Sequence, residues 1–371
     1  MDEISITIIG AGAVGLAIAA ELSATYDNIV LLERHENFGM ETSSRNSEVI
    51  HSGMYYPEDS LKTLLCREGA KRLYDLSVRH GIPHRKIGKL IIATDIAEQP
   101  ALEKLYMHGR QNGVDDLVLL DRHESGRIEP NTNAIAAIFS PGTGIIDSHA
   151  LMRHFYNKAV SRGVLVSFQS EVSLIEKMAD GFLVGIAKDN YRFRSRVIIN
   201  CAGLSADRVA ALAGMDTTAY GYRLIYCKGS YFSYAKPSPV LRLVYPIPHD
   251  ELVGLGIHAT IDLGGRLRFG PDAEYISEID YKIDASKRTL YYRGASKIIP
   301  GLEENSFLPD MAGIRPKLSG PGEKARDFII RHEADNGFAG LINLIGIESP
   351  GLTASPAIAE MVSHIVAGIA I

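Results

Sequence analysis

The chain has 371 residues, of which 46% are hydrophobic and 22% are charged, enough for one large or two ordinary domains with a sizeable core. Its formal net charge of -5 and the lack of a basic run argue against a nucleic-acid partner. Three cysteines, Cys66, Cys201 and Cys227, are an odd number without metal-ligand spacing, which indicates buried thiols in a reducing compartment and no metal site.

The N-terminal segment carries the most specific motif in the chain. Residues 4–9 form a β-branched run, typical of a strand that is buried on both faces. Gly10, Gly12 and Gly15 follow in G-x-G-x-x-G spacing, and an Ala-rich helix is expected over 14–22. The first glycine permits a tight turn, the second admits a pyrophosphate, and the third allows close packing of helix on strand.

An acidic residue completes this motif. A second strand is expected over 28–32, and it ends at Glu33. At this distance from the glycines a carboxylate can accept hydrogen bonds from the ribose hydroxyls of adenosine. The pattern therefore predicts an adenine dinucleotide whose phosphates face the helix N-terminus. NAD and FAD both fit the motif, and its position at the extreme N-terminus, with a polar loop directly after the second strand, favours FAD.

Two apolar segments resemble targeting or membrane signals. The first, residues 4–22, has the length of a signal peptide, but the acidic Asp2 and Glu3 stand where a signal peptide has positive charge, which argues against one. The apolar segment 357–371 is shorter than the roughly 20 residues that a membrane span needs. A packed final helix is expected there, with contact to a membrane surface as the alternative, and we expect a cytoplasmic protein.

Hydrophobic periodicity and capping residues predict further helices in the middle of the chain. They are expected over residues 61–80, 101–112, from Asp147 or Ser148 to 161, from 206 onward, and 286–298.

Short β-branched runs predict the strands. Single strands are expected over residues 86–94, 134–139, 197–201 and 340–348. An antiparallel meander is expected over 164–168, 172–178, 182–187 and 191–193. Several runs between 222 and 269, including 252–260, are expected to form one antiparallel sheet.

Nucleotide-domain patterns thus occur at the beginning, middle and end of the chain, with antiparallel sheet between them. The predicted fold class is α/β: a Rossmann-like FAD-binding domain with a parallel sheet, interleaved with a second α+β domain on a mixed or antiparallel sheet. We expect the first domain to hold residues 1–80, 145–215 and 310–371, and the second, substrate-binding domain to hold residues 81–144 and 216–309.

Together these landmarks resemble the D-amino-acid-oxidase-like superfamily of FAD-dependent oxidoreductases, and more narrowly the L-2-hydroxyglutarate oxidase/dehydrogenase group. The resemblance covers nearly the whole chain. It is carried by GAGAVG with Glu33, NSEVIHSGMYY, NCAGLSADR, KGSYF, YPIPHDELVGLGIHATIDLGGRLRFGPD and GIESPGLTASPAIAE. One segment differs: many members of the group have HQTGH before the NS pair, whereas METSSR at 40–45 is similar to the glycerol-3-phosphate dehydrogenase branch.

The resemblance implies that FAD lies along the glycine turn, the loop after the second strand and the start of the last helix. Amides at that helix start would stabilise negative charge on the reduced flavin. In some relatives a histidine near position 51 bonds covalently to the flavin, and here a non-covalent cofactor is expected. The expected FAD-binding residues are Gly10, Gly12, Ala13, Val14, Gly15, Glu33, Arg34, Thr42, Ser43, Asn46, Ser47, His51, Val172, Ala202, Gly203, Gly351, Leu352 and Thr353.

For catalysis, the resemblance places an arginine, Arg315 in AGIRPKL, near the active face of the flavin. The two parallel donors of a guanidinium match the two oxygens of a substrate carboxylate. A proton acceptor that titrates near neutrality indicates histidine, and His51 and His258 lie inside the recognised motifs. A buried structural histidine remains the alternative for either one.

A second substrate contact is expected from the segment CKGSYF. Lys228 and Tyr231 would line the substrate entrance and bind a distal carboxylate, with Arg268 as the weaker rival. Lys228 as a solvated edge residue is the alternative.

These features predict an FAD-dependent enzyme that oxidises a small 2-hydroxy acid, L-2-hydroxyglutarate or a near relative, to the 2-oxo acid by hydride transfer. The alternatives are an amine oxidase of the glycine or sarcosine type, a glycerol-3-phosphate dehydrogenase-like enzyme, and a non-catalytic flavin-binding protein. Oxygen, a quinone and a partner flavoprotein are equally compatible with the sequence as electron acceptor.

Overall fold

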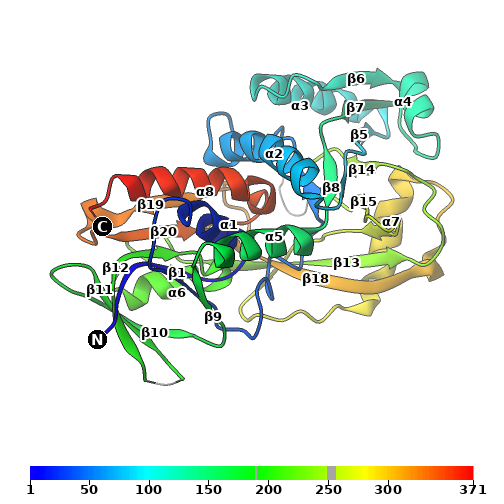
Figure 1. The fold of residues 1–371 in the computed structure, drawn as a ribbon. Helices are drawn as coiled ribbons and strands as arrows, with labels where there is room; N and C mark the ends of the chain where they lie inside the picture. Colours follow the sequence, from blue (N-terminus) through cyan, green and yellow to red (C-terminus); the bar gives the residue numbers. More distant parts are fainter. Residues whose placement is uncertain (189, 249–255, 371) are drawn as a thin grey trace.

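The computed structural model describes residues 1–188, 190–248 and 256–370, whose strands form two large sheets and one small one (Figure 1). The predicted α/β fold class with a parallel sheet and a second, mainly antiparallel sheet is confirmed. Part of the predicted strand over 252–260 lies outside the described residues, and β15 covers its end.

The first sheet has eight strands with a parallel centre in the order β9, β2, β1, β12, β20. A hairpin of β10 and β11 extends it beside β12, and β19 pairs antiparallel with β20. Its strands are β1 (Glu3–Ile9), β2 (Ile29–Leu32), β9 (Leu165–Ser167), β10 (Val172–Lys177), β11 (Phe182–Ile186), β12 (Arg192–Asn200), β19 (Ile329–His332) and β20 (Leu341–Ile345).

β1 is buried on both faces, as its β-branched sequence predicts. Ile6 and Ile8 face the helical layer, whereas Ile9 faces the hydrophobic cluster on the other side of the sheet. Ile8 lies opposite Leu31 of β2 and Ile199 of β12 in parallel register. This register holds the end of β1, where the glycine turn begins, at the carboxyl edge of the sheet.

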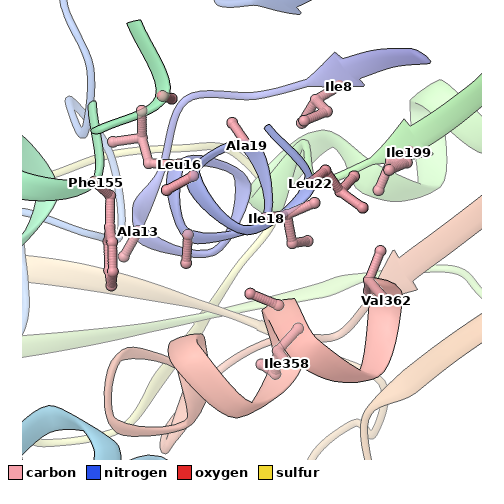
Figure 2. Close-up of a cluster of buried hydrophobic side chains, with 14 of the residues drawn as sticks. Ile8, Ala13, Leu16, Ile18, Ala19, Leu22, Phe155, Ile199, Ile358 and Val362 are labelled. Carbon is pink, nitrogen blue, oxygen red and sulfur yellow. The ribbon is translucent and has the colours of Figure 1, made fainter. Parts of the chain in front are cut away.

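Four helices cover one face of this sheet. Figure 2 shows side chains of α1 packed against Ile358 and Val362 of α8, with Phe155 of α5 beside them. α2 begins at the Ser60 cap, ends at Gly81 in the left-handed conformation, and packs on α8. These helices are α1 (Ala13–Leu22), α2 (Leu61–His80), α5 (Ser148–Ser161) and α8 (Gly351–Ala367).

α8 is the packed final helix that the sequence predicts. Its buried side chains include Ile358, Val362 and Val366. Among the described residues, no helix combines the length and the apolar character that crossing a bilayer requires.

The opposite face is covered by the β10–β11 hairpin and by α6 (Ala206–Leu212). Here two strand predictions were wrong. β9 does not belong to the meander but pairs parallel with β2, and it follows helix α5, which packs on one face of the same sheet. The predicted strands 191–193 and 197–201 are one continuous strand, β12. They were separated in the sequence because the first half of β12 alternates between exposed and buried residues, whereas its second half is fully buried.

The second sheet has nine strands and lies away from the two chain ends in Figure 1. It is antiparallel except for the pair β5–β14. α7 (Arg288–Ile298), α3 (Gln99–Gln111) and α4 (Arg122–Ile128) accompany it. The strands are β5 (Lys89–Ala93), β6 (Val118–Asp121), β7 (Ala136–Ser140), β13 (Ile225–Tyr234), β14 (Leu243–Pro246), β15 (Ala259–Ile261), β16 (Leu267–Phe269), β17 (Glu274–Ile276) and β18 (Phe307–Lys317).

The long strands β13 and β18 pair antiparallel over most of their length and run toward the first sheet (Figure 1). β3 (Val49–Ile50), β8 (Gly144–Ile146) and β4 (His84–Arg85) form a separate small sheet, with β8 in the middle. The proposed division of the chain into two domains stays a prediction, and its expected boundary after residue 309 falls inside β18.

Candidate active site

A cavity of about 1380 Å³ extends from the glycine turn after β1 to the facing strands β13 and β18. Drug-sized ligands occupy pockets of about 300–1,000 Å³, so this cavity has room for a larger molecule such as a dinucleotide. Residues of both large sheets line it.

The glycine turn leaves no room for side chains. A Cβ on Gly15 would lie 2.0 Å from the carbonyl oxygen of Gly10, and a Cβ on Gly10 would lie 2.5 Å from that of Cys201. At Gly12 a Cβ would lie 2.9 Å from Ser43 Oγ, which accepts a hydrogen bond from the Ala13 amide at 2.9 Å. Bare backbone therefore faces the cavity at the start of α1, as phosphate binding requires.

Glu33 is held at the cavity wall by two backbone amides. Its Oε2 accepts a hydrogen bond from Ala11 N at 2.8 Å, and its Oε1 accepts one from His35 N at 2.9 Å. Each carboxylate oxygen has a second lone pair, so the side chain can still accept hydrogen bonds from ribose hydroxyls. Beside it, Arg34 donates to Ser205 Oγ and pairs with Glu41.

The polar loop after β2 connects the two halves of the cavity. Thr42 Oγ1 donates to the carbonyl of Ile314 on β18 at 3.1 Å. Asn46 Nδ2 donates to the carbonyl of Ser43 at 2.7 Å, which closes the loop on itself. Every expected FAD-binding residue, from Gly10 to Thr353, lines the cavity, and the contact that each would make with FAD stays a prediction.

Arg315 projects from β18, opposite Cys227 of β13. Its guanidinium donates to Cys227 Sγ and to the carbonyl of Asp272, both at 3.3 Å. A Cβ at Gly229 would lie 2.9 Å from Nη2, so the glycine makes room for this side chain. Within the described part of the chain Arg315 forms no ion pair, and it faces the cavity as a carboxylate-binding group would.

His51 presents one ring nitrogen to a neighbouring hydroxyl. Its Nε2 lies 3.5 Å from Ser349 Oγ, and its Nδ1 is buried without a hydrogen-bond partner in the described residues. Burial, together with the charge of Lys89, lowers the pKa of His51 to about 3. The imidazole is therefore neutral at pH 7, but its pKa does not lie near neutrality as expected of the base.

His258 lines the same cavity from the second sheet and is 7% exposed. Its ring stacks on Tyr245, with centroids 3.7 Å apart and planes 7° apart. Tyr231 also lines the cavity, and burial raises the pKa of its phenol.

Two predicted substrate contacts lie elsewhere. Lys228 is not among the cavity-lining residues, and its Nζ lies 3.4 Å from Asp280 and 3.7 Å from Glu274. Arg268 is held by Asp310 at 2.8 Å, also away from the cavity. The structure therefore does not bring these two cations to the place where a substrate would bind.

Several residues of this region were missed in the sequence. Tyr55 and Tyr245 line the cavity, and Lys89 lies buried behind their rings. Glu348 lines it as well and pairs with Lys62 at 2.9 Å. Two signals were available: Tyr55, Tyr245 and Glu348 lie inside segments that carry the resemblance, and Lys89 is a lysine at the start of the apolar strand KLIIA.

The family model described as FAD dependent oxidoreductase matches residues 5–365. The chain belongs to this family. As an FAD-dependent oxidoreductase it uses FAD, which confirms the predicted cofactor, and the side-chain-free turn with the carboxylate of Glu33 fits the adenosine diphosphate half of that molecule. Non-covalent attachment stays a prediction.

Curated relatives match almost the whole chain. L-2-hydroxyglutarate dehydrogenase, mitochondrial, from Arabidopsis thaliana is 36% identical over 98% of this chain and 83% of its own. Glycerol 3-phosphate dehydrogenase from Caloramator mitchellensis is 31% identical over 98% of this chain and 74% of its own.

Solved structures of this FAD-dependent oxidoreductase fold superimpose well. Dithionite-reduced L-α-glycerophosphate oxidase from Mycoplasma pneumoniae with FAD bound has a TM-score of 0.87 and 28% identity, covering 99% of this chain and 95% of its own. Glycine oxidase from Geobacillus kaustophilus has a TM-score of 0.82 at 20% identity, covering 100% and 96%, and supports the fold alone.

Proposed function

We propose that this oxidoreductase converts a small 2-hydroxy acid, L-2-hydroxyglutarate or a near relative, to the 2-oxo acid. The observation that carries the proposal is the presence, in one cavity, of a neutral imidazole and a guanidinium that forms no ion pair within the described residues, although the carboxylate of Glu348 acts on it electrostatically. The 36% identity to an L-2-hydroxyglutarate dehydrogenase over 98% of the chain supports the choice of substrate.

Arg315 would bind the carboxylate next to the reacting carbon. Its contacts with Cys227 Sγ and the Asp272 carbonyl fix the guanidinium plane, and neither partner neutralises its charge by ion pairing. A fixed guanidinium orients a carboxylate through two parallel hydrogen bonds. The α-carbon of the substrate is thereby held in one position.

His51 would accept the proton of the substrate hydroxyl at Nε2, the nitrogen near Ser349. Its lowered pKa keeps the ring unprotonated at neutral pH, and it also makes His51 a weaker base than an ordinary histidine. His258, which lines the cavity and stacks on Tyr245, is the alternative base. Bound FAD supplies the acceptor for the hydride that leaves the α-carbon.

Glycerol 3-phosphate is the second candidate substrate. The METSSR segment, the relative from Caloramator mitchellensis and the Mycoplasma pneumoniae structure favour it. A guanidinium binds phosphate as well as carboxylate, so Arg315 does not discriminate between the two.

Anaerobic bleaching of the flavin tests the proposal. The holoenzyme is mixed with L-2-hydroxyglutarate, glycerol 3-phosphate, glycine or sarcosine, and the loss of the oxidised flavin absorbance is followed. L-2-hydroxyglutarate is expected to bleach it fastest. Bleaching by glycerol 3-phosphate alone would select the second candidate, and bleaching by glycine or sarcosine alone would identify an amine oxidase. A yellow protein that none of these compounds reduces would contradict an enzymatic role toward them.

A further inference from the structure

Lys89 is a buried cation beside the cavity. It is 0% exposed, and its Nζ has no hydrogen-bond partner in the described part of the chain. It begins β5, in which Ile91 and Ala93 point into a hydrophobic cluster. Burying an ammonium group without such partners costs several kcal/mol, so a structural role alone does not account for it.

Two tyrosine rings separate Lys89 from the cavity. Its Nζ lies 4.4 Å from the ring centroid of Tyr55 and 5.0 Å from that of Tyr245, within cation–π distance. Both tyrosines line the cavity, whereas Lys89 does not. The ammonium charge therefore lies directly behind an aromatic wall of the cavity.

The phenols of this wall can donate hydrogen bonds to a ligand. The Tyr55 hydroxyl is buried and has no hydrogen-bond partner among the residues that the structure describes. Burial raises the pKa of both Tyr55 and Tyr245, so each keeps its proton at any physiological pH. Protonated phenols backed by a cation are suited to an anionic group.

Arg315, Tyr231, Tyr55 and Tyr245 all line this one cavity, and Lys89 lies behind the last two. A molecule with one carboxylate at Arg315 therefore shares its space with the wall formed by Tyr55 and Tyr245. A second anionic group at this wall would meet the positive potential of Lys89.

We propose that Tyr55 and Tyr245, with Lys89 behind them, form the subsite for a second carboxylate of the substrate. The inference rests on the proposed function and deepens it, because it assigns residues to the second carboxylate of the substrate. Lys89 is a positioning residue that acts through the tyrosines and contributes positive potential. Lys228, which was predicted for this role from the sequence, forms ion pairs with Asp280 and Glu274 outside the cavity.

The protonation of Lys89 is also expected to change when a ligand binds. Burial lowers its pKa to about 7, so an appreciable fraction is protonated at neutral pH. A carboxylate bound on the other side of the tyrosines would favour the protonated form.

The test compares two ligands that differ only in the second carboxylate. Glutarate and pentanoate are titrated into the oxidised holoenzyme, and binding is followed by the flavin absorbance shift. Lys89→Met is expected to weaken glutarate about tenfold and pentanoate less than about twofold, since one charge is lost. At a pH above the acid limb of the activity profile, the KM for L-2-hydroxyglutarate should rise together with the Kd for glutarate, while kcat changes little.

Two further variants make the outcome decisive. Tyr55→Phe keeps the ring but removes a donor, so it should also weaken glutarate selectively, and it carries the test if Lys89→Met does not retain FAD. Lys228→Met removes a buried lysine of the same sheet and should leave the glutarate-to-pentanoate ratio unchanged. Equal weakening of both ligands by Lys89→Met and Tyr55→Phe, or a selective effect of Lys228→Met alone, would overturn the subsite.

The subsite and the proposed function fail in different ways. The function fails if L-2-hydroxyglutarate leaves the wild-type flavin oxidised, whatever the binding ratios are. The subsite fails, with the function intact, if the wild type is reduced but the variants show no selectivity. Selective loss of glycerol 3-phosphate binding in Lys89→Met, with glutarate unaffected, would assign the subsite to phosphate and overturn the carboxylate.

Discussion

Gly15 is the residue at which a single methyl group should abolish cofactor binding. A Cβ there would lie 2.0 Å from the Gly10 carbonyl oxygen, in the turn that faces the cavity. We expect Gly15→Ala to lower the flavin-to-protein absorbance ratio by at least about tenfold, because α1 must move off β1 to relieve the clash. Gly126→Ala in α4 is the matched control, since a Cβ there meets nothing within 4 Å. Equal flavin content in the two variants would contradict this role of the turn.

Arg315 should lose most of its function when replaced by the other basic residue. Lysine keeps the charge but cannot form two parallel hydrogen bonds to one carboxylate. Arg315→Lys is expected to lower kcat/KM by about 10- to 100-fold, the range for hydrogen bonds to a charged group. Arg268→Lys, at an arginine that pairs with Asp310 outside the cavity, should stay within about threefold of wild type. The prediction is wrong if both variants lose activity equally.

His51 should make activity persist into mildly acidic solution. Its pKa is lowered from 6.5 to about 3, so as pH falls the ring stays neutral, and able to accept a proton, well below pH 6.5. The acid limb of kcat/KM is therefore expected below pH 6.5. Lys89→Met should move that limb upward, because it removes a positive charge that lowers the His51 pKa. A wild-type limb at or above pH 6.5 would exclude His51 as a base of this kind.

At the scale of helices and strands, the carboxylate of Glu348 connects α2, β18 and the segment before α8. Glu348 pairs with Lys62 at 2.9 Å and with Lys317 at 3.2 Å, and all three side chains are largely buried. Glu348→Gln would leave two lysines without an anion, at a cost of about 3–5 kcal/mol.

A lower urea denaturation midpoint would report this cost. Glu360→Gln is the matched control, because Glu360 pairs with Arg72 at the surface and such pairs contribute about 0–1 kcal/mol. Similar midpoints for the two variants would show that the buried cluster does not hold these elements together.

The elements also differ in how far sequence predicted them. α2 was expected over residues 61–80 and has those bounds, because Ser60 and Gly81 are strong local caps. β9 was assigned to the wrong partner, since a three-residue strand carries no local information about which strand it joins. β6 and α4 were missed, because the short apolar run of β6 does not alternate with polar residues, although three of its four residues are exposed.

At the scale of the whole molecule, FAD should stabilise the fold by contacting both sheets. A ligand that binds only the folded state adds about 2.7 kcal/mol at 100 times its Kd. We expect the thermal midpoint of flavin-free protein to rise with FAD concentration, and less with FMN, which lacks the half that would meet Glu33 and the glycine turn. Acid precipitation should leave the flavin in the supernatant, in keeping with non-covalent binding. Equal shifts with FMN and FAD, or flavin retained in the pellet, would contradict these expectations.

The sequence by itself determined the local motifs of this protein: the glycine turn, the acid after the second strand and the segments that carry the resemblance. Each depends on residues close together in the chain, where backbone geometry leaves few alternatives. Tertiary structure alone decided which distant side chains share the cavity. It placed Lys228 in ion pairs outside and Lys89 behind Tyr55 and Tyr245. The reason is physical: strand pairing and the direction of each side chain on a sheet depend on long-range contacts, which no local pattern encodes.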